Sequence, residues 1–373
     1  MPTVDAVRSA LHTVLDPEIR RPITDLGMVR SVDVDAGAVV VGIDLTTAGC
    51  PLRDTLTRDI TAAVGELDGV ASVEVQMGVM TPEQREALRT QLRGGPTPVI
   101  PFAQPNSLTK VYAIASGKGG VGKSSVTSNL AAAMAADGLN VGVVDADVYG
   151  FSVPRMLGVD RAPTKVDDMI LPPIAHGVKV ISIGMFVPPG QPVVWRGPML
   201  HRALEQFLSD VFWGDLDVLL LDLPPGTGDI AISVAQLLPN SEILVVTTPQ
   251  SAAAEVAERA GSIASQTRQH VVGVLENMSW FETPDGTRVE VFGSGGGEMV
   301  AANLSTVTGT SVPLLAQVPM QTSVRAAGDA GTPVVLSEPD SPAAQALRTV
   351  AETLAARSRG LAGKSLGITP LTH

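Results

Sequence analysis

Residues 117–124, which read GKGGVGKS, have the types and spacing that bind the phosphates of a nucleotide. In the pattern G-x-x-x-x-G-K-[ST], glycines let several backbone N–H groups face one phosphate. The pattern predicts that Lys123 contacts the β- and γ-phosphates, that the Ser124 hydroxyl binds Mg²⁺ and that Ser125 reaches the α-phosphate. An ordinary glycine-rich turn is the alternative interpretation. The predicted phosphate loop consists of Gly117, Lys118, Gly119, Gly120, Val121, Gly122, Lys123, Ser124 and Ser125.

The stretches on either side of this loop favour the nucleotide interpretation. Residues 111–115 are apolar and predict a strand, and residues 123–136 predict a helix that ends at Gly138. A helix that begins at the loop directs its positive end at a bound phosphate. We therefore expect a P-loop ATPase that binds ATP with Mg²⁺ and hydrolyses the ATP.

Three aspartates follow two further apolar stretches. Residues 141–144 lead to Asp145 and Asp147, and residues 218–221 lead to Asp222. Ligands of an open parallel sheet bind at the carboxyl ends of its strands, so these carboxylates are expected beside the γ-phosphate. Asp222 is the expected Mg²⁺ ligand, and either Asp147 or Asp145 would position the attacking water. A buried or helix-capping aspartate is the alternative in each case.

Lys118 follows the first glycine of the loop, where phosphate binding alone needs no second cation. This deviant loop, KGGVGKS, resembles that of the ATPases of the MinD/ParA and nitrogenase-iron-protein group. The resemblance implies a homodimer in which the lysine reaches the partner's nucleotide and adds positive charge at the transferring phosphoryl group. A solvated loop lysine is the alternative. The expected catalytic residues are Lys118, Lys123, Asp145, Asp147 and Asp222.

Asn277 is a candidate contact for the base of the nucleotide. It comes just after the apolar residues 271–275. The ATPases that this chain resembles recognise adenine with an asparagine at this place, where the amide can both donate and accept a hydrogen bond. A turn asparagine is the alternative.

The composition argues against several classes of protein. The net charge is −12 with only 26 Lys and Arg residues, and aromatic residues make up 3%, which disfavours nucleic-acid binding. No apolar run approaches the ~20 residues that span a membrane, and residues 1–18 lack a secretory signal pattern. We therefore expect a cytoplasmic protein that binds neither nucleic acid nor membranes.

The apolar pattern divides the chain into two domains. Residues 1–93 alternate helix-like and strand-like stretches and predict a small α+β domain. Residues 94–108, rich in Pro and Gly, predict a linker, and residues 358–373 predict a flexible tail. In residues 109–357, strands of nearly continuous apolar character alternate with helical stretches, which predicts an α/β fold. Its mostly parallel sheet would be covered by helices on both faces.

Longer segments resemble a known family. DADVYGFSVPRMLG at residues 145–158 and DLPPGTGD at residues 222–229 look like the Mrp/ApbC branch of these ATPases, and the match spans about residues 110–336. DPEI at residues 16–19 and LTTAGCPL at residues 45–52 resemble the small iron–sulfur-assembly domain that is often fused in front of it. The resemblance implies a homodimeric carrier or scaffold that hydrolyses ATP and hands iron–sulfur clusters to apoproteins.

The chain departs from that family after ENMSWF at residues 276–281. Many members have C-P-x-C-G there and hold a bridging cluster between two subunits, whereas this chain has ETPDG at residues 282–286. Iron–sulfur clusters need thiolate ligands, commonly four. The single cysteine, Cys50, excludes a site with several thiolates from one chain, so the usual cluster site is absent.

Cys50 is the one protein thiolate left for a metal. It directly precedes Pro51, at the start of a predicted helix whose positive end favours the thiolate form of the sulfur. A small buried apolar residue is the alternative interpretation of Cys50.

Two functions follow as hypotheses. The first is an ATP-hydrolysing carrier or assembly protein for iron–sulfur clusters, which serves apoproteins or works with assembly factors. Its cofactors would be ATP, Mg²⁺ and an iron–sulfur cluster. The second is a nucleotide-switched dimeric interaction or positioning ATPase that carries no metal.

Overall fold

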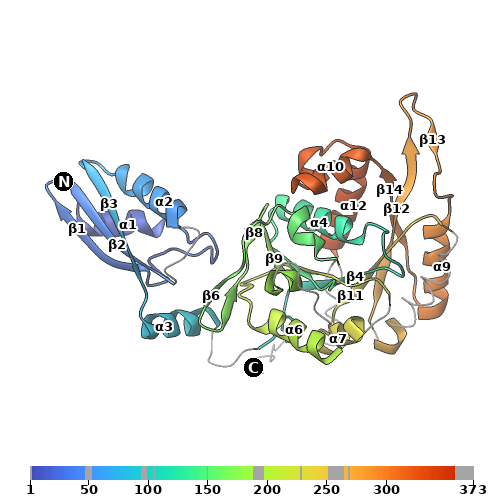
Figure 1. Cartoon of the computed structure of the whole chain (residues 1–373), viewed down its shortest axis with the longest axis horizontal. Coiled ribbons are helices and arrows are strands. Elements are labelled where there is room, and N and C mark those ends of the chain that lie inside the picture. Colours follow the sequence, from blue (N-terminus) through green and yellow to red (C-terminus); the bar gives the residue numbers. More distant parts are fainter. Residues whose placement is uncertain are drawn as a thin grey trace, which may run out of the picture.

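The chain folds into a small N-terminal domain and a larger C-terminal domain (Figure 1). The computed structural model describes residues 2–46, 53–93, 99–104, 106–148, 150–187, 197–226, 229–250, 264–267 and 269–357. Cys50, the first part of the predicted linker and the predicted tail lie outside these described residues.

The small domain has a three-stranded sheet covered by helices. In this sheet β2 pairs antiparallel with β1 and parallel with β3. Leu11, Leu56 and Ile60 come from the two helices packed on the sheet, and all three are fully buried. The elements are α1 (Val4–His12), β1 (Val29–Asp35), β2 (Ala38–Leu45), α2 (Arg53–Gly65), β3 (Ser72–Val79) and α3 (Pro82–Arg93). The predicted small α+β domain is confirmed.

The large domain is built on a sheet with the order β13-β12-β11-β4-β10-β5-β9-β8, and β14 pairs with β12. All of its neighbouring strands pair in parallel except the edge pairs β12–β13 and β8–β9. The strands are β4 (Lys110–Ala115), β5 (Val141–Asp145), β8 (Ile174–Ala175), β9 (Val178–Ser182), β10 (Val218–Asp222), β11 (Glu242–Thr247), β12 (Val271–Glu282), β13 (Arg288–Val289) and β14 (Leu314–Met320). The predicted, mostly parallel sheet is confirmed.

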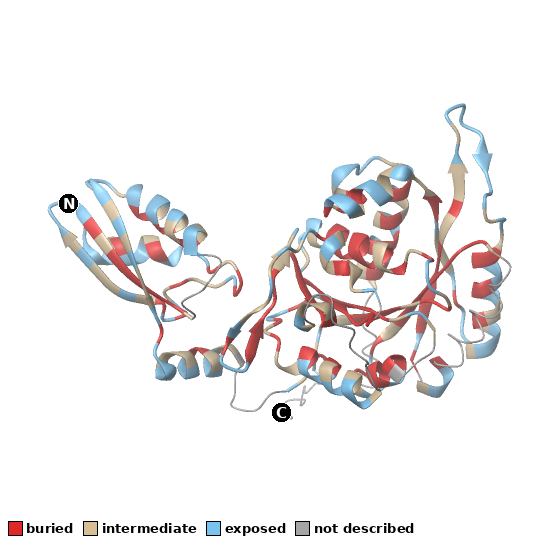
Figure 2. Ribbon diagram, viewed as in Figure 1, coloured by how far each residue is buried: buried red, intermediate tan, exposed pale blue. Residues whose placement is uncertain are grey.

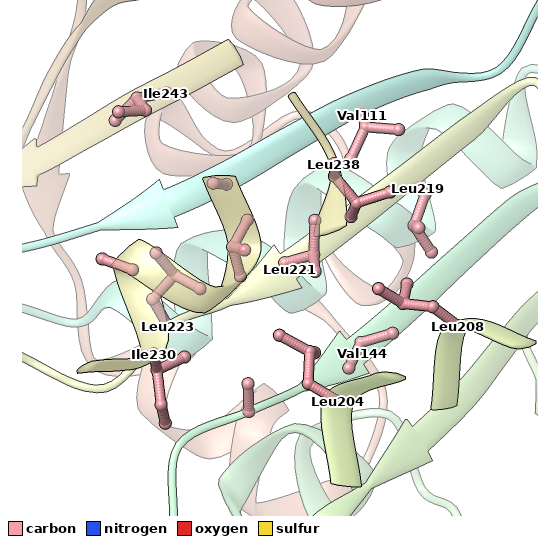
Figure 3. Packing of buried hydrophobic residues seen from close by; sticks show 14 of the residues in the cluster. Val111, Val144, Leu204, Leu208, Leu219, Leu221, Leu223, Ile230, Leu238 and Ile243 are labelled. Carbon is pink, nitrogen blue, oxygen red and sulfur yellow. The ribbon is translucent and has the colours of Figure 1, made fainter. Parts of the chain in front are cut away.

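Helices cover both faces of this sheet, so β5 and β10 are buried along their whole length and β4 is buried except at its two end residues (Figure 2). One face carries α6 (Gly197–Ser209), α7 (Asp229–Leu237) and α9 (Gly296–Thr308), and the other carries α4 (Lys123–Ala136), α5 (Ser152–Met156), α10 (Thr322–Ala330), α11 (Val334–Ser337) and α12 (Pro342–Ala356). Figure 3 shows Leu204 and Leu208 of α6 among the strand residues Val144, Leu219 and Leu221. None of the described helices is both long and apolar enough to span a bilayer.

Part of the predicted linker packs against the large domain. Residues 101–103 form a short 3₁₀ helix, η1 (Pro101–Ala103). Phe102 in this turn is 3% exposed, and its ring centroid lies 6.3 Å from that of Trp213. This end of the linker is therefore held in the core by an aromatic contact, which its Pro-rich composition did not reveal.

A β-hairpin of the large domain completes the core of the small domain. Its strands are β6 (Thr164–Val166) and β7 (Met169–Leu171). Val166, Met169 and Leu171 are at most 1% exposed and belong to the same apolar cluster as Leu11 and Leu45. This shared cluster holds the two domains together.

Polar contacts surround the same hairpin. Arg85 and Arg89 of α3 pair with Asp167 and Asp168 at the hairpin turn, at 3.1 and 2.7 Å. Thr164 Oγ1 also donates a hydrogen bond of 2.7 Å to the buried Glu18. The DPEI segment of the small domain therefore contacts the large domain directly.

Candidate nucleotide site

The phosphate loop lies where the motif predicts, between β4 and α4. Gly120 and Gly122 have φ values of 80° and 82°, a left-handed conformation that favours glycine. A Cβ atom added at Gly122 would collide with the side-chain amide of Asn277. The left-handed φ is therefore the main reason for glycine at Gly122, and the missing side chain also leaves room for the Asn277 amide in its present position.

Lys123, the first residue of α4, holds its ammonium group inside the site. Its side chain is 5% exposed, and Nζ lies 2.8 Å from Asp222 Oδ2 and 3.7 Å from Asp147 Oδ2. Asp222 is thus its close ion-pair partner, but Nζ has no acceptor in hydrogen-bond geometry within the described part of the chain. The two carboxylates thus balance the buried charge, and the N–H groups stay available for phosphate oxygens.

Asp222, at the end of β10, receives two hydroxyl groups from α4. Ser124 Oγ donates to Asp222 Oδ2 at 2.5 Å, and Thr127 Oγ1 donates to Asp222 Oδ1 at 2.8 Å. Asp222 is fully buried. Mg²⁺ prefers hard oxygen ligands. The Ser124 hydroxyl and the Asp222 carboxylate supply two of them beside the buried Lys123. The residues present therefore fit the predicted magnesium site.

Thr127 was missed by our sequence analysis. Its position one helical turn after Lys123 was the available signal, because residues four apart lie on the same face of a helix. The Thr127 hydroxyl also donates to the Lys123 carbonyl at 3.0 Å, which fixes the rotamer that reaches Asp222.

Asp145, at the end of β5, is fully buried and accepts three hydrogen bonds. The donors are the backbone N–H groups of Asp147 and Val153, at 3.2 and 3.3 Å, and Ser182 Oγ at 3.2 Å. Burial, and secondarily the negative charge of Asp222, raise the pKa of Asp145 to about 7. Asp145 thus holds the following segment in place, while Asp147 joins Asp222 beside the Lys123 ammonium.

Lys118 makes a contact within its own subunit. Its Nζ donates to Gln250 Oε1, in the segment that follows β11. Gln250 was not among the predicted site residues, although its position after the carboxyl end of a parallel strand was a signal. The role of Lys118 across a dimer interface stays a prediction.

Asn277 lies inside β12, which runs beyond the predicted strand to Glu282. Its Nδ2 donates to the Val121 carbonyl of the phosphate loop at 2.9 Å. Asn277 also lines a cavity of about 570 Å³ beside the loop, together with Gly122, Ser125, Met278, Phe281, Pro319, Met320, Gln321, Thr322 and Val324. This cavity has the size and mixed polarity of a small-molecule site and begins where the phosphate loop ends.

Comparison with known proteins agrees with this geometry. The family model of the NUBPL iron-transfer P-loop NTPases, of the ParA group, matches residues 107–355. The chain belongs to this family. A second model, for iron–sulfur cluster assembly proteins, matches residues 4–77, which lie in the small domain of this P-loop NTPase.

Relatives of this NTPase resemble it over nearly its whole length. It is 64% identical over 367 residues to the iron-sulfur cluster carrier protein of Mycobacterium tuberculosis. The aligned residues cover 98% of this chain and 96% of the relative. The protein of the same name from Deinococcus radiodurans is 43% identical over 354 residues, 94% of each chain. The predicted family is therefore confirmed.

A solved structure supports the fold of the NTPase domain. The nucleotide-binding protein from Archaeoglobus fulgidus, solved in complex with ADP, is 31% identical and superimposes with a TM-score of 0.53. The match covers 70% of this chain and 95% of that one.

The segment that replaces the cysteine motif of many family members is the tip of the β12–β13 hairpin. There, Thr283 Oγ1 donates to Asp285 Oδ1 at 2.5 Å and to the Thr287 carbonyl at 3.0 Å. No cluster of three or more His, Cys, Asp or Glu side chains placed to hold a metal occurs among the described residues. Cys50, the predicted thiolate, is not among them.

Proposed function

We propose that this chain binds ATP with Mg²⁺ at the site around Lys123 and hydrolyses it. The observation that carries the proposal is the buried Lys123 ammonium beside the Ser124–Asp222 pair. This ammonium lies 2.8 Å from Asp222 but has no acceptor in hydrogen-bond geometry among the described residues. Lys123 would hold the β- and γ-phosphates, and Ser124 and Asp222 would hold the metal. Bound Mg²⁺ neutralises charge on the β- and γ-phosphate oxygens.

Asp147 is the proposed residue for positioning the attacking water. Its carboxylate approaches Lys123, so it would lie near the γ-phosphate that Lys123 binds. Asp145 would act through Asp147, because its oxygens accept hydrogen bonds from the Asp147 N–H and from two further donors.

Hydrolysis would be completed by a second copy of the chain. Lys118 would leave Gln250 and reach the partner's nucleotide, where a cation stabilises charge on the transferring phosphoryl group. Asn277 and Ser125 line the cavity next to the loop and are the proposed contacts for the adenosine and the α-phosphate.

The proposed role of this ATPase is to carry iron–sulfur clusters to apoproteins in the cytoplasm. The support is the name of the relatives at 64% and 43% identity, together with the small domain that matches iron–sulfur assembly proteins. Each subunit has one thiolate, Cys50, so a bridging cluster would take ligands from both subunits and from a further source.

Anaerobic reconstitution with iron and sulfide tests this role. We expect the full chain to gain visible absorbance and bound iron, and the Cys50→Ala variant to gain much less. The reconstituted protein should then activate an iron–sulfur apoenzyme. A colourless wild-type protein with the iron content of Cys50→Ala would refute the carrier role and leave the ATPase proposal standing.

A metal-free, nucleotide-switched interaction protein is the second candidate. It is favoured by Thr283, whose hydroxyl bonds to the hairpin turn where many family members hold a cluster with a cysteine. Pull-downs with wild type and Lys123→Ala separate the two candidates. A nucleotide-switched protein should lose its partners when Lys123 is replaced, whereas a passive scaffold for clusters should keep them.

A further inference from the structure

A second polar pocket lies between the two domains, away from the nucleotide site. Its volume is about 360 Å³, and its lining includes Arg20 and Arg21 from the small domain and Lys179 and Asp215 from the large domain. Lys179 is in β9, close to the first residue of that strand, whereas Ser182 at the other end of β9 contacts Asp145. From Lys179 to Ser182 the strand rises about 10 Å at ~3.3 Å per residue, so the pocket and the nucleotide site lie at opposite ends of this strand.

A tight turn presents the two arginines to this pocket. The Asp16 N–H donates to the Arg21 carbonyl at 2.9 Å, and the Arg20 N–H donates to the Asp16 carbonyl at 2.7 Å. The Asp16 carboxylate closes the turn by accepting from the Glu18 and Ile19 N–H groups, at 2.9 and 2.8 Å. Arg20 adopts a φ of 58°, which is uncommon for a residue with a side chain. These hydrogen bonds thus fix the backbone that carries both guanidinium groups.

Lys179 adds a buried cation on the opposite wall. The residue is 9% exposed, its Nζ donates to the Trp213 carbonyl at 2.6 Å, and Nζ lies 5.0 Å from the centroid of the Phe212 ring. Burial, and then the charge of Arg20, lower the pKa of Lys179 to about 8, while Asp215 opposes this shift. Burial and the neighbouring Arg20 thus both disfavour the charged ammonium, which a nearby anion would stabilise.

Positive charge exceeds negative charge among the residues that line the pocket. Arg20, Arg21 and Lys179 face the single carboxylate of Asp215. Within the described part of the chain, neither guanidinium group makes an ion pair or a hydrogen bond. Arg20 is exposed, Arg21 is half-buried and Lys179 is buried with a backbone carbonyl as its acceptor. A bound anion would offset the repulsion among these three positive charges.

We propose that this interdomain pocket binds a small oxyanion, a molecule that carries phosphate or carboxylate groups. Guanidinium groups match both kinds of oxyanion with paired N–H donors. The volume is at the lower end of the range for small-molecule sites, which suits a small multivalent anion. Because its cations come from both domains, the anion would also fix the small domain against the large one.

Calorimetric titration of the full chain tests the proposal. The protein is first loaded with ADP and freed of excess nucleotide, so that the phosphate loop is occupied. Inorganic phosphate and citrate are then titrated separately at matched ionic strength, which distinguishes the phosphate and carboxylate sources of the same chemistry. We expect at least one of them to bind one site with a dissociation constant below about 1 mM.

The variants locate this binding in the pocket. The double variant Arg20→Gln/Arg21→Gln should weaken it at least tenfold, whereas Arg8→Gln, an exposed arginine on α1, should leave it unchanged. If the double variant does not fold, Lys179→Met takes its place with the same expected loss. Absence of binding to wild type, or equal binding by wild type and the pocket variant, would overturn the proposal.

Discussion

Ser124 Oγ donates a hydrogen bond of 2.5 Å to Asp222 Oδ2, which brings together the hydroxyl and the carboxylate that are expected to share one Mg²⁺. The Ser124→Ala variant should keep nucleotide binding in the absence of Mg²⁺ but lose the gain in affinity that Mg²⁺ provides. We expect kcat to fall roughly a hundredfold, or about 2.7 kcal/mol in the activation free energy. Steady-state hydrolysis across a range of Mg²⁺ concentrations measures both effects.

The matched control for Ser124→Ala is Ser128→Ala, one turn further along the same helix. The Ser128 hydroxyl is buried and makes no hydrogen bond within the described residues, so its removal should cost little. Equal losses of activity in the two variants would contradict a metal-binding role for Ser124.

Lys118 should matter for turnover more than for binding. The Lys118→Ala variant should retain nucleotide affinity and lose most of its hydrolysis, because Lys118 is proposed to act on the partner's nucleotide. Fluorescent-nucleotide binding and phosphate release measure the two properties separately.

Gln250→Ala provides the comparison for Lys118→Ala. It removes the acceptor that holds Lys118 in its own subunit, and it should leave hydrolysis intact or raise it. Normal hydrolysis by Lys118→Ala would refute the cross-subunit role.

The raised pKa of Asp145 predicts how stability changes with pH. The folded chain keeps a proton on Asp145 up to about pH 7, whereas the unfolded chain loses it near the ordinary pKa of 3.8. Wild type therefore loses stability from this group as the pH rises through that window. The Asp145→Asn variant lacks this loss. Because the pKa of Asp145 is raised by ~3 units, the stability of the variant relative to wild type should grow by about 4 kcal/mol between pH 4 and pH 7.

Urea unfolding at several pH values measures this difference. Asp68→Asn is the matched control, because Asp68 is exposed and should show almost no pH-dependent difference from wild type. A pH-independent difference between Asp145→Asn and wild type would mean that Asp145 is ionised throughout this range.

The apolar residues of the β6–β7 hairpin should hold the domains together more strongly than its ion pairs. Met169→Ala empties a fully buried position in the shared cluster and should cost about 2–5 kcal/mol. Arg89→Ala removes a partly exposed pair with Asp168 and should cost at most about 1 kcal/mol. Calorimetry should show a separate unfolding transition of the small domain in Met169→Ala but not in Arg89→Ala. A larger loss of stability in Arg89→Ala than in Met169→Ala would contradict this view of the junction.

Local patterns in the sequence were enough to identify the phosphate loop and the elements beside it. The predicted helix at residues 123–136 has the bounds that the structure shows, and Asp145 and Asp222 lie at the ends of the predicted strands. These features depend on neighbours within a few residues, because glycine conformation, helix start and strand burial are set locally.

The tertiary structure decided which distant groups meet. Thr127 reaches Asp222, and Gln250 reaches Lys118, only because β10 and β11 both lie next to β4 in the sheet. Strand order is not encoded in hydrophobic periodicity, so no local pattern could pair residues 95 or 132 positions apart. The same reason applies to the interdomain hairpin and to the cationic pocket. GKGGVGKS by itself thus predicted nucleotide binding, while the packing of the sheet and the domains determined the partners of each charged group.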